Sequence, residues 1–248
     1  GLFVDDAKSG ASFMGLPRPS ILAAAMSPYL WVNPHGVRFV DEGLGNGPYL
    51  ASAVSRQKNR TSFTIMDSNA KRHLQENGLE LNTYMDVMPT KLGDLDNDIQ
   101  AALAEGNISA QMGESIEELA AKIKINPATL QQTIDAYNAC CDKGHDDLFA
   151  KNPRFLRPVS TPPFYAFQCS AIGYGTIGGI KINERAEAVD KDCDSIPGLY
   201  AAGDCAAGTL TYDYPLVYIL WGCTLGFAVN SGRIAGESSA AYIKSLSK

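Results

Sequence analysis

Residues 173–180, with the sequence GYGTIGGI, restrict the fold more than any other part of the chain, because four of these eight residues are glycine. They follow an apolar run at residues 164–172 that has the composition of a strand. A glycine-rich loop of this kind binds phosphate when a helix follows it, since the phosphate lies at the helix N-terminus. Here the sequence GGIKIN follows and alternates with period two, which predicts a strand. We therefore exclude a dinucleotide phosphate loop and expect these glycines to let a large planar group approach the backbone.

The composition is that of a folded protein without a nucleic-acid footprint. With 248 residues, of which 45% are hydrophobic, the chain can bury a substantial core. Its 21 basic residues are scattered and the formal net charge is -6, so we expect no binding to nucleic acid. The longest apolar run, residues 214–229, contains Pro215, Gly222 and Gly226 and is too short for a membrane span, so we expect it to be buried. The chain begins at Gly1 without an initiator methionine, and we expect it to be a fragment.

The six cysteines predict neither a metal site nor a disulfide framework. Cys140 and Cys141 are adjacent, the other four stand alone, and no CxxC or Cys/His ligand spacing occurs. We expect mostly reduced thiols and no bound metal.

The first two thirds of the chain predict short helices and strands in alternation. Residues 30–42 read as a hairpin with His35 at its tip, where a solvated turn residue is favoured over a catalytic one. A helix is expected at residues 48–58 and a strand at 61–66. Two further helices begin at the caps Ser115, with Glu118 three residues later, and Asn126, which proline follows.

Residues 142–163 are polar and contain several prolines, which predicts a linker before the strand at 164–172. The last third reads as a β-meander of short strands at residues 180–183, 186–189 and 199–202. A helix at residues 223–245, thinned by small side chains, should end the chain and lie against a sheet. Asp204 follows the apolar stretch 196–203, where an aspartate is either a ligand contact beyond a strand end or a turn former.

Several motifs together resemble one family. The segments WVNPHGVRFVDE, PPFYA, GTIGGIKIN, IPGLYAAGD and LGFAVNSGRIAGESSAAY, with the helical stretch at residues 114–151, occur in the order and approximate spacing of the fumarate reductase/succinate dehydrogenase flavoprotein superfamily. That superfamily includes soluble fumarate reductases, urocanate reductases and 3-ketosteroid dehydrogenases. The resemblance covers residues 31–242.

The resemblance implies a mixed α+β and α/β fold with FAD as the cofactor. Residues 1–160 are expected to form a cap domain that binds substrate, and residues 161–248 the C-terminal part of an FAD-binding, Rossmann-like domain. Nothing in the chain matches the N-terminal dinucleotide-binding βαβ unit of such proteins. We therefore expect that unit to lie outside this chain, and weak FAD affinity without it.

The resemblance also assigns cofactor contacts. It places Gly178 and Gly179 beside the isoalloxazine ring and Asp204 at the ribityl chain. It brings a helix N-terminus to the pyrimidine edge of the flavin, where negative charge gathers on reduction. The residues expected in that helix N-terminus are Gly222, Cys223, Thr224 and Leu225.

The chain departs from the fumarate reductase pattern at its substrate positions. The arginine expected after the RFV hairpin corresponds to Asn46 or Gly47, and the histidine expected before the Thr-x-Gly-Gly motif corresponds to Gly175. No arginine occurs at residues 216–221, where Trp221 is found instead. Asn46, Gly175 and Trp221 are therefore expected to line a site for a substrate other than a dicarboxylate. Tyrosines take the place of these charges and can donate a proton or pack on a flat apolar substrate. The candidates for catalysis are Tyr49, Tyr174, Tyr214 and Tyr218, and each also has a reading as a core residue.

These observations predict an FAD-dependent oxidoreductase that acts on a C=C or CH–CH bond next to a carbonyl, in an apolar enone or cyclic ketone. An acrylate-type reductase for a monocarboxylate is the alternative within the class. A fragment that binds a ligand or partner without catalysis is the alternative outside it. The expected partners are a small-molecule substrate and either the N-terminal part or an electron-donor protein.

Overall fold

A computed structural model describes residues 2–4, 18–44, 48–81, 90–171, 178–206 and 223–247. The chain divides into two compact units, Gly1–Ile172 and Gly173–Lys248, which we call unit 1 and unit 2. The expected boundary after residue 160 lies ahead of strand β5 (Phe164–Ala171), and β5 is part of the sheet of unit 1. The assignment of the two parts to a cap and an FAD-binding domain stays a prediction.

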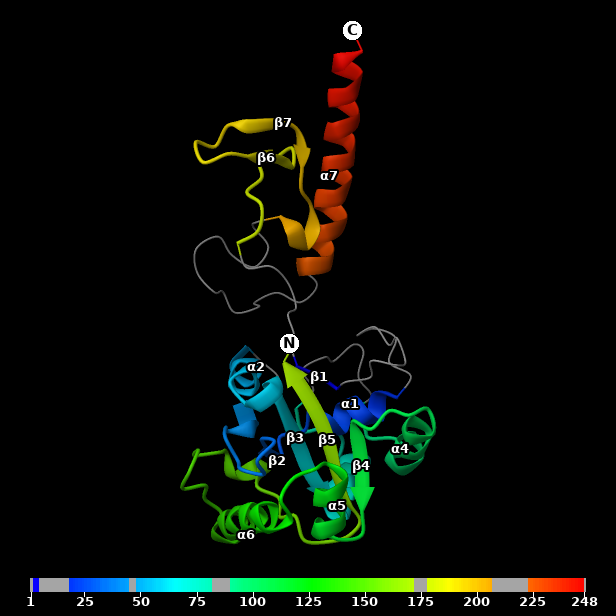
Figure 1. Cartoon of the computed structure of the whole chain (residues 1–248), viewed down its shortest axis with the longest axis vertical. Coiled ribbons are helices and arrows are strands. Elements are labelled where there is room, and N and C mark those ends of the chain that lie inside the picture. The colour runs from blue at the N-terminus through cyan, green and yellow to red at the C-terminus, as the bar shows by residue number, and fades with distance from the viewer. Residues whose placement is uncertain are drawn as a thin grey trace. The chain divides into compact units, whose positions relative to one another are not determined.

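Unit 1 is built around an antiparallel sheet with β5 near its middle (Figure 1). One edge of β5 pairs with β3, from Thr61↔Ser170 to Asp67↔Phe164, and β3 pairs in turn with β2. The other edge pairs with β1 near one end and with β4 near the other. The remaining strands are β1 (Leu2–Val4), β2 (Leu30–Val32), β3 (Thr61–Asp67) and β4 (Ala110–Gly113).

Helices cover both faces of this sheet. Successive side chains of a strand point to opposite faces, so Met66 and Tyr165 pack in one core cluster while Ile65 and Ala166 pack in another. The first face is covered by α1 (Pro19–Ala25), α2 (Pro48–Ser55), α3 (Ser68–Asn77) and α4 (Leu95–Ala104), and the second by α5 (Ile116–Lys122) and α6 (Pro127–Lys143). Because both faces are covered, β3 is buried along its whole length.

The predicted helix caps are confirmed. The Ser115 side chain accepts a hydrogen bond from the backbone N–H of Glu118 at the start of α5. The Glu118 carboxylate accepts a hydrogen bond from the N–H of Glu114, whereas in a standard capping box it would accept from the N–H of Ser115. At α6 the Asn126 side chain accepts from the N–H of Thr129, and Gly144 ends the helix with a left-handed φ of 68°.

The hairpin at residues 30–42 is shorter than the sequence predicts. Its turn closes with hydrogen bonds between Asn33 and Val37 and between Gly36 and Asn33, and His35 is exposed in it. Beyond the turn, one bridge joins Val32 to Arg38, and the returning chain then forms the 3-10 turn η1 (Glu42–Leu44). The second strand stops there because Arg38 and Glu42 turn their charged ends into the protein.

These two side chains belong to a buried ionic group of four residues that we call the Arg38 cluster: Arg38, Glu42, Asp146 and Lys151. The Arg38 guanidinium donates to both Glu42 oxygens at 2.8 Å and to both Asp146 oxygens at 2.9 and 2.7 Å. Lys151 Nζ donates to the hydroxyl of Tyr137 at 3.1 Å and lies 3.3 Å from Glu42. Two cations and two anions balance, and every member is at most 8% exposed.

The Arg38 cluster changes the interpretation of residues 142–163. We predicted a linker, but Asp146, Lys151 and Phe155 of this segment are buried within unit 1. The polar segment is therefore a folded part of unit 1. The segment contains the short 3-10 turn η3 (Pro153–Phe155).

Acid should weaken unit 1 through Asp146. Burial alone would raise the pKa of this carboxyl, but the hydrogen bonds and charge of Arg38, with the N–H groups of Leu148 and Phe149, outweigh it and lower the pKa from 3.8 to about 2. A lowered pKa gives stability that is present above the unfolded value near 3.8 and is lost as pH falls toward 2. We expect the free energy of unfolding to fall by about 1–2 kcal/mol more across this window in the wild type than in Asp146→Asn. Urea titrations at pH 5, 4, 3 and 2 measure this difference, and equal pH slopes for the two proteins would refute the assignment.

Unit 2 contains a two-stranded sheet and a long helix. β6 (Glu187–Val189) and β7 (Ser195–Tyr200) are antiparallel, with the bridges Ile182↔Ala188 and Ile180↔Ala206 beside them. The 3-10 turn η4 (Gly203–Cys205) follows β7, and α7 (Cys223–Leu246) runs along β7 and η4 (Figure 1). The predicted three-stranded meander is only partly confirmed. Isolated bridges occur at residues 180 and 182 in place of the strand expected at 180–183, and β7 ends at Tyr200, whereas a strand was expected at 199–202. The terminal helix is present, and α7 packs against the sheet as expected.

Candidate functional site

The predicted site residues fall into two groups. Those outside the described residues are Asn46, Tyr174, Gly175, Tyr214, Tyr218, Trp221 and Gly222. Cys223 is described in its backbone as the first residue of α7. The described remainder are Tyr49 in unit 1 and Gly178, Gly179, Asp204, Thr224 and Leu225 in unit 2.

Gly178 and Gly179 both have left-handed backbones, with φ of 95° and 72°. A side chain at either position would be strained, so glycine is the residue that this path of the chain requires. Among the described residues, none has a heavy atom within 4 Å of a Cβ atom added to Gly178. Within that part of the chain, the backbone at Gly178 is open to approach by another group.

Ile180, the residue after the two glycines, connects them to η4. The N–H of Ile180 donates to the carbonyl of Cys205 at 2.8 Å, and Ile180 forms a parallel bridge with Ala206. Asp204, between Gly203 and Cys205, is exposed. An open glycine backbone and an exposed carboxylate thus lie on neighbouring segments of unit 2.

The first turns of α7 complete this arrangement. Gly203 has a φ of 59° and lies against Ala228, where a Cβ on the glycine would be 3.5 Å from the alanine Cβ. The N–H of Gly203 donates to Ser231 Oγ at 3.0 Å. The first turn of α7 contains no acidic residue, and a helix N-terminus carries a partial positive charge.

Ser231 is a positioning residue that sequence reasoning missed. We interpreted it as one of the small residues that keep the helix at 223–245 thin, but the residue is 4% exposed and its hydroxyl joins η4 to the helix. The hydroxyl also donates to the Phe227 carbonyl at 2.6 Å. A small polar residue inside a stripe of glycine and alanine was the available signal.

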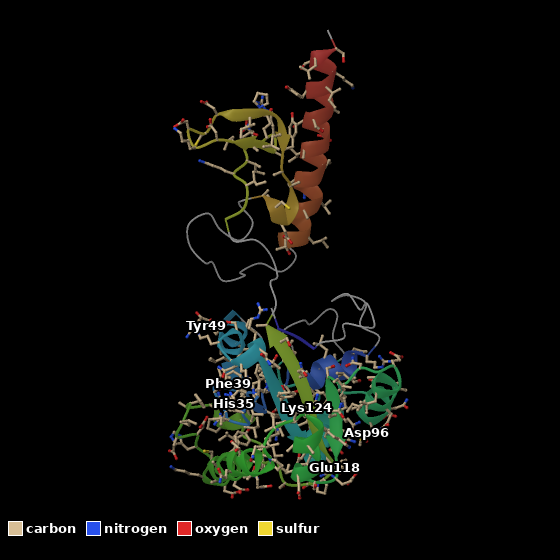
Figure 2. All side chains as sticks on the ribbon, viewed as in Figure 1. His35, Phe39, Tyr49, Asp96, Glu118 and Lys124 are labelled. Atoms are coloured by element: carbon tan, nitrogen blue, oxygen red, sulfur yellow. The ribbon has the colours of Figure 1, made fainter. Side chains whose placement is uncertain are left out.

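Tyr49 lies in unit 1, at the second position of α2 (Figure 2). Its side chain is 69% exposed, whereas Leu50 and Val54 of the same helix are buried with Trp31. Within the described part of the chain, its hydroxyl makes no hydrogen bond, so it is available to a ligand at the surface of α2.

Among the described residues, no three His, Cys, Asp or Glu side chains gather in a way that could hold a metal ion. Of the described helices, none is both long and apolar enough to cross a bilayer.

The chain belongs to the FAD binding domain family, whose model matches residues 15–216. The superfamily predicted from the motifs is thereby confirmed, and FAD is the cofactor that the family indicates. Its curated relatives include enzymes named as reductases and oxidoreductases.

The chain is 35% identical over 239 residues to a vinyl phenol reductase of Lactiplantibacillus plantarum, and the match covers 94% of this chain and 47% of that protein. It is 33% identical over 237 residues to an NADH:acrylate oxidoreductase of Vibrio harveyi, covering 96% of this chain and 20% of that protein. The chain thus spans less than half the length of these relatives.

Two solved structures share the fold. One is a flavocytochrome c3 fumarate reductase in an open conformation, with a TM-score of 0.63 at 22% identity over 92% of this chain and 34% of that one. The other is a 3-ketosteroid delta1-dehydrogenase from Sterolibacterium denitrificans, with a TM-score of 0.58 at 24% identity over 92% of this chain and 41% of that one. The predicted mixed fold is confirmed by these likenesses.

The described residues of unit 2 fit an FAD-type ligand. A flat ring system needs backbone that carries no side chain, which Gly178 supplies, and a reduced flavin needs positive potential, which the start of α7 supplies. Asp204 can accept hydrogen bonds from ribityl hydroxyls. The individual cofactor and substrate contacts stay predictions.

Proposed function

We propose that this chain is part of a flavin-dependent reductase that acts on a conjugated C=C bond in an uncharged, largely apolar substrate. When bound, FAD supplies the hydride chemistry, and the protein supplies binding, orientation and electrostatics. Gly178 and Gly179 would line the ring, Asp204 would hold the ribityl chain, and the start of α7 would favour the reduced cofactor. Tyr49 is proposed to donate the proton, with Tyr174, Tyr214 and Tyr218 as the further candidates.

The similarity to a vinyl phenol reductase carries the proposal for the substrate. A vinyl phenol has a conjugated C=C bond and no carboxylate. The sequence agrees, because Asn46 or Gly47 corresponds to the arginine of the fumarate reductase pattern and Gly175 corresponds to its histidine. A site without these cations leaves a carboxylate unpaired, which is unfavourable when the site is closed to water. The substrate class that follows includes vinyl phenols, enones and cyclic ketones.

An acrylate-type reductase is the second candidate. The 33% identity to an NADH:acrylate oxidoreductase over 96% of this chain favours it. In that case one carboxylate would need a cationic side chain that we have not assigned. A binding module without catalysis is the third candidate. The flavin content of the full-length protein separates it from the other two, since a full-length protein that stays colourless with added FAD would favour it.

A substrate panel tests the proposal. The flavin-loaded protein is reduced with a dye such as reduced methyl viologen and then mixed with 4-vinylphenol, cyclohexenone, acrylate or fumarate. We expect kcat/KM for the better uncharged substrate to exceed that for either carboxylate by at least about tenfold. If acrylate were reduced as well as the uncharged alkenes, the acrylate-type alternative would replace the proposal.

A further inference from the structure

Glu42, the first residue of η1, has a buried carboxylate whose two oxygens are both occupied. Its Oε1 accepts from Arg38 Nε at 2.8 Å and from the backbone N–H of Trp31 at 3.1 Å. Its Oε2 accepts from Arg38 Nη2 at 2.8 Å and lies 3.3 Å from Lys151 Nζ. Because an ionised carboxylate can only accept hydrogen bonds, these donors hold both oxygens, and with them η1, in one orientation.

Trp31 extends this anchor to α2. Its backbone is bonded to Glu42, and its ring lies in one core cluster with Leu50 and Val54 of that helix. The indole N–H donates to the Ser27 carbonyl at 3.1 Å, so the ring is fixed as well. Close-packed buried side chains transmit a displacement to their neighbours, and the position of α2 therefore follows that of Trp31.

Tyr49 depends on the same anchor for its position. The helix α2 begins at Pro48 and contacts η1 directly, so Tyr49 lies in the turn nearest to η1 (Figure 2). Leu50 is buried, whereas Tyr49, about 100° away around the helix, is exposed. Because the tyrosine ring is largely free of packing, its orientation is set by the backbone of α2.

We infer that Glu42 is the positioning residue for Tyr49: its carboxylate fixes η1 and Trp31, and through them the start of α2, so that the tyrosine hydroxyl meets the reacting carbon. The inference rests on the proposed function, in which Tyr49 donates the proton. Glu42 acts from the core of unit 1 and is not a catalytic residue. Its effect can be large, because a catalytic group misplaced by about 1 Å can cost about 100-fold in rate.

Glu42→Gln keeps the shape of the side chain but removes one acceptor oxygen. In either orientation of the amide, its NH2 group faces donors: Arg38 Nη2 and Lys151, or Arg38 Nε and the N–H of Trp31. We expect η1 and Trp31 to shift and α2 to loosen. Asp146→Asn is the matched control, because Asp146 is the other buried carboxylate paired with Arg38 and its remaining hydrogen bonds go to backbone N–H groups of its own loop.

Hydrogen exchange of the full-length protein tests the anchor without turnover. In Glu42→Gln, we expect amide exchange at residues 48–55 to rise by about tenfold relative to exchange at residues 95–104 of α4, because α2 opens locally. In Asp146→Asn, both helices should change together, since the loss of a buried partner lowers the stability of the whole unit. An unchanged ratio in Glu42→Gln, or an equal change of the ratio in Asp146→Asn, would overturn the inference.

A double-mutant cycle tests the link to Tyr49. Turnover of the best uncharged alkene of the substrate panel is measured in the flavin-loaded full-length protein and in its Glu42→Gln, Tyr49→Phe and doubly substituted forms. We expect Glu42→Gln to lower kcat by about tenfold with little change in KM, and to have no effect beside Tyr49→Phe, where no hydroxyl is left to misplace.

The cycle separates failure of the inference from failure of the proposed function. An equal loss of kcat from Glu42→Gln in both backgrounds would show a general structural role and would overturn the inference alone. Full turnover in Tyr49→Phe would refute the proposed role of Tyr49 and the inference with it, even where the exchange ratio shows that Glu42 fixes α2.

Discussion

Replacing Arg38 with methionine is expected to lower the free energy of unfolding of unit 1 by about 3–5 kcal/mol. The side chain is paired with two buried carboxylates, Glu42 and Asp146, and its removal leaves both without a cation at that position. Breaking a buried ion pair from one side costs more than the pair itself contributes, because the remaining charge stays desolvated. The guanidinium also lies over the rings of Tyr137 and Phe149, at 5.1 and 5.0 Å, so packing is lost as well.

Urea unfolding followed by tryptophan fluorescence measures this effect. The backbone N–H of Trp31 donates a hydrogen bond to Glu42, so the environment of Trp31 should change when the cluster is disrupted. Lys143→Met is the control. It removes the cation of an exposed pair with Asp147 in the same unit and should leave the unfolding midpoint nearly unchanged. A small effect of Arg38→Met, similar to that of the control, would show that the two carboxylates are hydrated or protonated in the folded protein.

The elements that could be predicted from the sequence are those with local causes. The caps at Ser115 and Asn126 depend on residues within one turn, and so their helices begin where the sequence indicates. The strand at β3 was also found, but its burial on both faces was not, because the covering helices come from distant segments.

Long-range pairing explains the incorrect predictions in unit 1. Asp146 and Lys151 looked like linker residues because each is charged, and only the partner Arg38, 108 residues from Asp146, makes burial of that carboxylate favourable. The pairing of β5 with β1, β3 and β4, which places β5 in unit 1, is likewise not revealed by composition. The predicted division into a cap and an FAD-binding domain stays a prediction.

The candidate site shows the same difference between local features and long-range contacts. Gly178 and Gly179 were found because left-handed backbone leaves a mark in the sequence, namely glycine. The hydrogen bond from Gly203 to Ser231 joins residues 28 apart and leaves no such mark, since serine is common in thin helices. The sequence thus predicts the positions that require glycine, and their role in a site stays a prediction, while the contacts that hold η4 against α7 required the structure.

A functional test at Tyr49 separates proton donation from packing. In the flavin-loaded protein, Tyr49→Phe is expected to lower kcat on the preferred alkene by about 100-fold with little change in KM, because general acid catalysis contributes in the transition state. The substitution removes one hydroxyl from a side chain that is 69% exposed, so the fold of α2 should not change.

Tyr242→Phe is the matched control for this test. It makes the same chemical change near the C-terminal end of α7, where the ring lies 3.4 Å from the position that a Cβ on Gly198 would take. This end of the helix is remote from its first turn, so the variant should keep full turnover. The pH profile gives an independent readout, since loss of the proton donor should remove one ionisation from the profile of kcat. Full turnover in Tyr49→Phe with an unchanged profile would exclude Tyr49 as the donor. The next tyrosines to replace would then be Tyr174, Tyr214 and Tyr218. The proposal for the uncharged substrate would be tested separately, because it rests on Asn46 and Gly175 and on the likeness to a vinyl phenol reductase.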